Sequence, residues 1–74
     1  MERLINLLQE VKDGVDFAAE KGLVTDGILE SMDLVMIVSA IEEVFEIEIP
    51  FDYVRKANFE NVDAMWAMIR ELTQ

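Results

Sequence analysis

The segment from Ser31 to Phe45 limits the possible folds more than any other part of the sequence. At about 100° per residue, its apolar side chains collect on one broad arc of a helix: Leu34, Ile37, Val38, Ile41, Val44 and Phe45. Ser39, Glu42 and Glu43 fall on the opposite arc. A helix with this pattern packs one face and leaves the other in water. The segment therefore predicts an amphipathic helix that lies against a helical core.

Two further segments show helical spacing. Residues 2–12 carry the apolar set Leu4, Ile5, Leu8 and Val11, and Asp13-Gly14 follows as a stop signal. Asn61 is a favourable N-cap, Asp63 falls in the first turn after it, and the apolar stripe Val62, Met65, Trp66, Ile69 and Leu72 follows. We expect a first helix over residues 2–12 and a last helix from Asn61 onward.

The connections between these helices differ in length. Residues 15–29 lose the helical period and contain Gly22 and Gly27, so they predict a long loop, anchored by the apolar residues Phe17, Leu23, Ile28 and Leu29. Residues 46–50 alternate and end at Pro50, which favours an extended connector. Residues 51–59 predict one short helix that carries Tyr53 and Val54, with Arg55 and Lys56 near its end.

The length of 74 residues predicts a single domain over residues 1–74. A chain this short buries only about 60% of its unfolded surface, so its core is small. We expect an all-α fold: a small four-helix bundle of three main helices and one short helix, with a long loop between the first and second helices.

The charge balance restricts the partners. Sixteen acids against six bases give a net charge of −10, which argues against nucleic-acid binding and against an anionic membrane surface. No basic residue stands between Lys21 and Arg55, whereas acids are frequent there. We expect any docking partner to be basic, and the charge favours a monomer.

Cysteine and histidine are both absent, which removes thiol nucleophiles, common zinc ligands and the commonest general base. The sequence therefore predicts that the protein is not an enzyme and holds no metal. It has no apolar run of the roughly 20 residues that cross a membrane. Its first residues, Met-Glu-Arg-Leu, lack the basic-then-apolar order of a signal peptide, so we expect a cytoplasmic protein without membrane insertion.

Ser31 stands at the predicted start of the central helix, between Glu30 and Asp33. Residue preferences at helix ends, taken alone, favour Ser31 as an N-cap, and the Asp33 carboxylate would complement the positive end of the helix. The capping-box partner is missing, because Leu34 occupies the third position after the serine. The cap interpretation does not explain why Met32, Val35 and Met36 place apolar side chains beside the serine, on or near the polar face.

This neighbourhood resembles a known family. The run Asp-Gly-Ile-Leu-Glu-Ser-Met-Asp-Leu-Val at 26–35 is similar to the attachment site of acyl carrier proteins. The run Ala-Ile-Glu-Glu-Val-Phe-Glu-Ile-Glu-Ile-Pro at 40–50 resembles the end of that family's second helix, and Asn-Phe-Glu-Asn-Val-Asp-Ala at 58–64 resembles the start of its last helix. The resemblance covers residues 2–72.

The resemblance implies that Ser31 carries the 4′-phosphopantetheine arm of coenzyme A, attached by a separate Mg²⁺-dependent phosphopantetheinyl transferase. The thiol of the arm would hold acyl or aminoacyl groups as thioesters. We infer that the phosphate points outward and that the arm stays mobile unless its cargo finds an apolar cleft, for which the space between the second helix and the short helix is a candidate. Loading and transferring enzymes would then dock with basic patches on the acidic face of the second helix. The implied partner-binding residues are Glu30, Met32, Asp33, Met36, Glu42 and Glu43.

Two positions depart from the family pattern. Glu30 stands where the family has aspartate, and Met32 stands where it usually has leucine. These departures favour a specialised carrier. Fatty acyl, polyketide, D-alanyl and other aminoacyl cargoes all remain alternatives, as in fatty acid, polyketide or nonribosomal biosynthesis.

A second class of function fits the same charges. A non-catalytic acidic helical adaptor would bind a basic protein through the helix at 31–45 and use Ser31 only as a cap. Such an adaptor would keep its binding after Ser31→Asp, which preserves a cap, whereas a carrier would lose its function. A calcium loop is disfavoured, because the residues after Asp26 lack the alternating oxygen ligands of an EF-hand.

Overall fold

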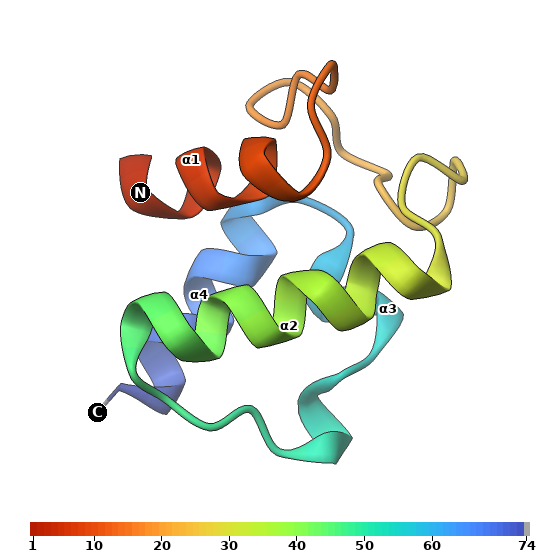
Figure 1. Cartoon of the computed structure of the whole chain (residues 1–74). Helices are drawn as coiled ribbons and strands as arrows, with labels where there is room; N and C mark the ends of the chain where they lie inside the picture. Colours follow the sequence, from red (N-terminus) through yellow and green to blue (C-terminus); the bar gives the residue numbers. More distant parts are fainter. Residues whose placement is uncertain (74) are drawn as a thin grey trace.

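The computed structural model describes residues 1–73 and shows the expected all-α fold. Its helices are α1 (Glu2–Val11), α2 (Ser31–Phe45), α3 (Lys56–Phe59) and α4 (Val62–Leu72), with a 3₁₀ turn, η1, at Phe51–Tyr53. In Figure 1, α2 runs back below α1 in the opposite direction, and α4 lies behind α2. The three long helices and the long loop between α1 and α2 were predicted correctly.

One hydrophobic core joins the three long helices and the loop. Nine side chains have less than 2% of their surface exposed. They are Leu4, Leu8, Phe17, Leu23, Ile37, Ile41, Phe59, Met65 and Ile69. Phe17 and Leu23 come from the long loop, so this loop is part of the core although it contains no helix.

The ends of the helices follow local chemistry. The side chain of Asn61 accepts a 2.8 Å hydrogen bond from the backbone N–H of Ala64, as expected of the N-cap of α4. α2 ends at Phe45, and its C-cap residue Glu46 has a left-handed backbone, with φ of 54°. After Glu46, the N–H of Ile49 donates a 2.9 Å hydrogen bond to the Glu42 side chain. This bond fixes the extended connector against α2.

The short helix predicted over 51–59 is present, but α3 covers only Lys56–Phe59 of that range. The separate turn η1 ends at Tyr53, and Val54 lies outside any helix. Asn58 donates a 2.8 Å hydrogen bond to the carbonyl of Tyr53 and stabilises this break. Arg55 and Lys56 consequently stand at the start of α3 rather than near the end of a helix.

Candidate functional site

The first turn of α2 is capped by Glu30 and Asp33. Glu30 has extended backbone angles and is the N-cap residue, and its N–H donates a 2.9 Å hydrogen bond to Oδ2 of Asp33. This bond is the reciprocal contact of a capping box. The N-cap is Glu30, one residue before the serine that residue preferences favoured. The interpretation of Ser31 as the N-cap was therefore wrong.

The Ser31 hydroxyl has no structural role in this arrangement. Ser31 is the first helical residue and is exposed, and within residues 1–73 its side chain makes no hydrogen bond. Because the neighbouring acids cap the helix, the hydroxyl is accessible and chemically unengaged. An accessible hydroxyl is what a modifying enzyme needs.

An apolar groove begins at Ser31. It has a volume of about 310 Å³, and Ser31 is the only polar residue among those that line it, which also include Leu34, Val35, Val38 and Val54. Val54 comes from the segment between η1 and α3, so the groove lies between α2 and this segment. A group tethered to Ser31 would reach apolar surface without crossing the protein.

The loop that leads to Ser31 is tied to the α3–α4 junction by Glu60. Oε1 of Glu60 accepts hydrogen bonds from the N–H of Val24 at 2.9 Å and of Thr25 at 2.8 Å, and the Thr25 hydroxyl donates to Oε2. The backbone carbonyl of Glu60 accepts a further 2.8 Å bond from the N–H of Leu23. These bonds fix the backbone a few residues before Ser31.

The contacts of Glu60 predict a pH dependence of stability. Hydrogen bonds from Thr25 and Val24 hold the pKa of Glu60 below its ordinary value in the fold. A lowered folded-state pKa means that the unfolded chain takes up the proton first, so this stabilisation is present at neutral pH and is lost as pH falls. We expect wild type to lose stability more steeply than Glu60→Gln between about pH 5 and about pH 3 in denaturant titrations. Parallel curves would contradict this role of Glu60.

A second contact joins the end of α1 to the start of α2. Nζ of Lys12 lies 2.9 Å from Oδ2 of Asp33, and the Asp33 side chain is 16% exposed. The N–H of Glu30 and the Lys12 ammonium together lower the pKa of Asp33. Asp33 therefore remains charged and is engaged within the chain.

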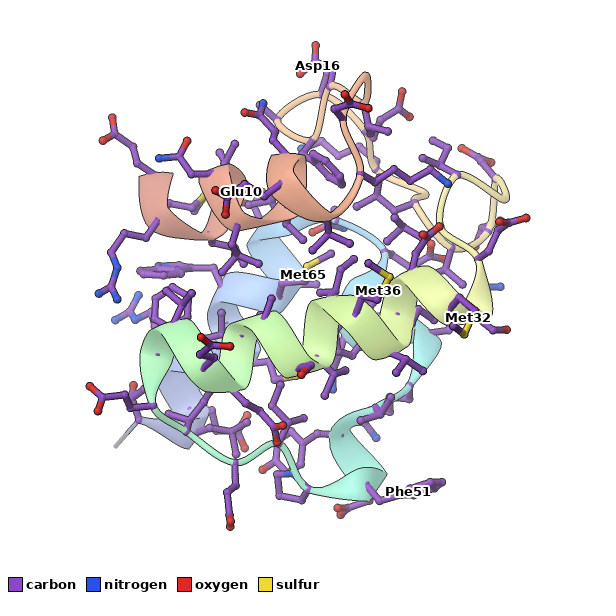
Figure 2. All side chains as sticks on the ribbon, viewed as in Figure 1. Glu10, Asp16, Met32, Met36, Phe51 and Met65 are labelled. Carbon is purple, nitrogen blue, oxygen red and sulfur yellow. The ribbon has the colours of Figure 1, made fainter. Side chains whose placement is uncertain are left out.

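The six residues implied as partner contacts fall into two groups. Glu30, Met32, Met36 and Glu43 are exposed, with 70% of Met32 and 47% of Met36 open to solvent (Figure 2). Asp33 and Glu42 instead accept hydrogen bonds from Glu30, Lys12 and Ile49. The exposed four can meet a partner directly, whereas the other two first support the local structure.

Two residues of the segment between Pro50 and α3 were not identified as functional candidates from the sequence. Phe51 is 88% exposed and points away from the body of the protein (Figure 2), and Val54 lines the groove at Ser31. Both lie in the part of 51–59 that is not α-helical. The available signal was Pro50, because proline often marks a turn or loop.

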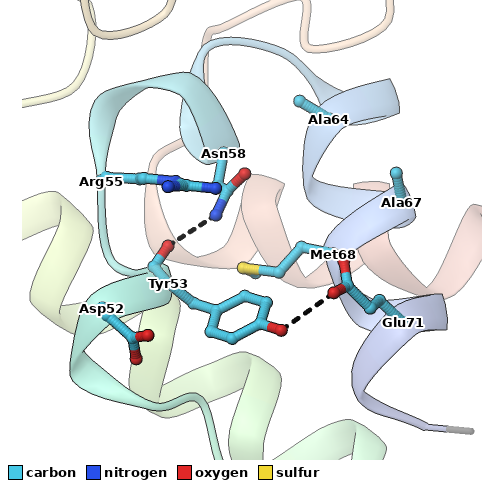
Figure 3. A pocket seen from close by; sticks show the side chains of 8 residues that line it. All are labelled: Asp52, Tyr53, Arg55, Asn58, Ala64, Ala67, Met68 and Glu71. Carbon is cyan, nitrogen blue, oxygen red and sulfur yellow. Dashed lines mark hydrogen bonds between the residues drawn. The ribbon is translucent and has the colours of Figure 1, made fainter.

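A separate cavity of about 430 Å³ lies between the η1–α3 segment and α4 (Figure 3). On its wall, the Tyr53 hydroxyl donates a 2.9 Å hydrogen bond to Glu71, and this carboxylate raises the pKa of Tyr53. The contact attaches η1 to α4 and so helps to place Val54 opposite α2.

Residues 1–73 include no helix long and apolar enough to cross a bilayer. In the same part of the chain, no group of three acidic side chains is arranged to hold a metal ion. Comparisons with protein-family models, with curated proteins and with solved structures found no match to this chain.

Proposed function

We propose that the chain is a carrier protein that holds acyl or aminoacyl groups as thioesters on a 4′-phosphopantetheine arm attached to Ser31. The observation that carries the proposal is the Ser31 hydroxyl, which is exposed and unengaged at the start of α2 while Glu30 and Asp33 cap that helix. The groove beside it and the resemblance of residues 26–35 to carrier attachment sites add support.

The chemistry of attachment needs a second protein. The Ser31 oxygen attacks the phosphorus that bears the pantetheine group of coenzyme A, a serine phosphodiester forms, and adenosine 3′,5′-bisphosphate leaves. The hydroxyl proton must pass to a base. Asp33 is a poor base, because its contacts lower its pKa, and the chain has no histidine. The transferase therefore supplies the base and the Mg²⁺.

The attached phosphate fits the start of α2. A phosphate gains from the positive end of a helix, and the ammonium of Lys12 already offsets the charge of Asp33 at 2.9 Å. Glu30 is exposed and repels the phosphate, which favours an outward-pointing phosphate and a mobile arm. Mobility lets one arm visit several enzymes.

The groove favours apolar cargo. Burial of about four methylenes contributes about 3 kcal/mol before the cost of ordering the chain is subtracted. A net gain of about 1 kcal/mol raises the Tm of a domain this size by about 4–8 °C. We therefore expect the octanoyl-loaded protein to unfold at a higher temperature than the acetyl-loaded protein in thermal melts.

Val54→Ser provides the control for this prediction. Val54 is 37% exposed, so the substitution disturbs the unloaded protein little while it makes one groove wall polar. We expect the octanoyl effect to shrink in this variant. Equal Tm values for the two loaded forms of wild type would contradict cargo binding in the groove.

The direct test of the proposed function is transfer of phosphopantetheine from coenzyme A to the purified chain. A broad-specificity phosphopantetheinyl transferase and Mg²⁺ are added, and modification is read as a gain in intact mass. Gain of a single phosphopantetheine supports a carrier.

A further inference from the structure

The cavity between the η1–α3 segment and α4, called the η1–α4 cavity below, has no role in the proposed carrier function. Its volume of about 430 Å³ falls within the range of about 300–1,000 Å³ that is usual for small-molecule sites. Neither Ser31 nor Val54 lines it, so it is separate from the groove at Ser31. The cavity therefore has the size of a binding site of its own.

The floor of the η1–α4 cavity is apolar. Ala64 and Ala67 line it from α4, and their short side chains leave room that larger residues would fill. The buried side chain of Met68 extends from α4 between Tyr53 and Asn58 (Figure 3). An alkyl chain laid across this floor would contact carbon and sulfur atoms rather than charges.

Charged side chains stand on both walls of the cavity. Arg55 lies on the wall formed by the η1–α3 segment, and Glu71 lies on the α4 wall (Figure 3). Asp52 lines the cavity from η1. All three are exposed, and within residues 1–73 none of them forms an ion pair. Both walls therefore carry charge that a ligand can meet.

Tyr53 lies among these charges. Its hydroxyl donates a 2.9 Å hydrogen bond to Oε1 of Glu71, and this bond is the main cause that raises the pKa of Tyr53. The charge of Asp52 raises the same pKa further, and the charge of Arg55 opposes the rise. The positive group and both negative groups consequently act on a single ring.

The mixture of charges selects the ligand. A carboxylate attracted by Arg55 alone would be repelled by Asp52 and Glu71, and an amine attracted by the two acids would be repelled by Arg55. A molecule with a carboxylate at one end and an amine at the other satisfies both walls. Packed helices have axes about 8–10 Å apart, so a spacer of about four to six methylenes would bridge the walls.

We propose that the η1–α4 cavity binds a linear ω-amino carboxylic acid. Its carboxylate would pair with the Arg55 guanidinium, its ammonium group would pair with Glu71, and its alkyl chain would lie over Met68. This site goes beyond the proposed function, because binding needs neither Ser31 nor an attached arm. Failure of either proposal would leave the other intact.

The test titrates 6-aminohexanoate into the purified chain at physiological salt and follows protein chemical shifts by NMR. Tyr53 is the only tyrosine of the chain, so its ring signals report on this cavity without overlap from a second tyrosine. We expect saturable binding with a Kd of about 1 mM, as suits a ligand of about nine non-hydrogen atoms. Hexanoate and hexylamine each lack one charged end and should bind about fivefold more weakly.

Matched charge variants separate the cavity from general electrostatics. Arg55→Gln and Glu71→Gln should each weaken binding of 6-aminohexanoate about fivefold, and Glu71→Gln keeps an acceptor for the Tyr53 hydroxyl. Arg70→Gln and Glu48→Gln make the same changes at exposed positions outside the cavity. These two controls should change the Kd by less than about twofold.

A second pair of variants tests the space rather than the charge. Ala67→Leu places a larger side chain in the cavity from an exposed position of α4 and keeps every charged group, so binding should weaken at least about tenfold. Ala57→Leu makes the same change at an exposed position of α3 outside the cavity and should bind like wild type. Leucine is a good helix former, so both helices should be kept.

The expected result is saturable binding of 6-aminohexanoate, selective loss in the cavity variants, and shift changes centred on Tyr53, Arg55, Met68 and Glu71. Absence of saturable shifts up to about twenty times the expected Kd would overturn the proposal. Equal binding of hexylamine or hexanoate would also overturn it, because one end of the ligand would then be unrecognised. Shift changes centred on Val35 and Val54 would contradict it as well, since they would place the ligand in the groove at Ser31.

Discussion

Phe17→Ala is expected to lower the free energy of unfolding by about 3–5 kcal/mol. Phe17 is 1% exposed and comes from the loop between α1 and α2, not from a helix. Removal of the ring leaves a cavity in the core, and this core is small because the chain is short. Since small domains sit near the lower end of the usual 5–15 kcal/mol range of stability, this variant should be largely unfolded near 37 °C.

Phe51→Ala is the matched control. It removes the same side chain from a position that is 88% exposed, so the free energy of unfolding should change by less than about 0.5 kcal/mol. Denaturant titration followed by far-UV circular dichroism gives both values. Similar losses in the two variants would contradict the packing of the long loop into the core.

The loop anchor also matters for the site. Phe17 and Leu23 are buried, and Glu60 fixes residues 23–25, so the chain reaches Glu30 along a defined path. The start of α2 is therefore held from the core side and from α1, where Lys12 pairs with Asp33. Because the start of α2 is fixed on two sides, only the arm on Ser31 would need to move in the proposed carrier.

The helices could be predicted because their signals are local. The apolar period of residues 31–45 requires one buried face, and α2 has the predicted bounds Ser31–Phe45. Asn61 caps α4 as expected, because its side chain needs only the N–H of Ala64, three residues away.

The details of the site could not be predicted because they depend on distant residues. Glutamate is not among the preferred N-cap residues, whereas serine is, so these preferences favoured Ser31 as the N-cap. The structure instead uses Glu30 with Asp33, and Lys12 at the end of α1 stabilises that arrangement. The bond from Ile49 to Glu42 likewise joins residues seven positions apart across the end of α2. Helical spacing carries no information about these contacts.

The break in residues 51–59 has a similar cause. The sequence contains several residues there that tolerate either helix or turn, so its pattern did not locate the break at Val54 and Arg55. Two hydrogen bonds stabilise the break: the Tyr53 hydroxyl donates to Glu71, and the Asn58 side chain donates to the Tyr53 carbonyl. The break places Val54 in the groove at Ser31, where it would contact the cargo of the proposed carrier.

Ser31→Ala is expected to abolish modification by phosphopantetheinyl transferase completely. The substitution removes the attacking oxygen but no hydrogen bond found within residues 1–73, so the fold should be retained. Ser39→Ala removes the other serine, an exposed residue of the same helix, and should be modified like wild type. Circular dichroism of each variant checks that loss of modification does not reflect unfolding.

Glu30→Asp addresses the departure from the carrier pattern. Glu30 is the N-cap residue of α2 and is exposed beside Ser31, so the transferase of the proposed carrier would meet its carboxylate directly. Aspartate is shorter by one methylene and is the better N-cap, so the helix start should be kept. We expect faster modification of this variant by a general transferase, measured as initial rates. An unchanged rate would contradict a role of Glu30 in transferase recognition.

The carrier proposal is tested by the intact mass of wild type after incubation with coenzyme A, Mg²⁺ and the transferase, with Ser31→Ala, Ser39→Ala and Glu30→Asp treated in parallel. We expect all chains except Ser31→Ala to gain one phosphopantetheine. No mass gain in either wild type or Glu30→Asp, with both correctly folded, would contradict the carrier proposal and favour an acidic adaptor. A gain that persists in Ser31→Ala would contradict the assignment of Ser31 as the attachment site.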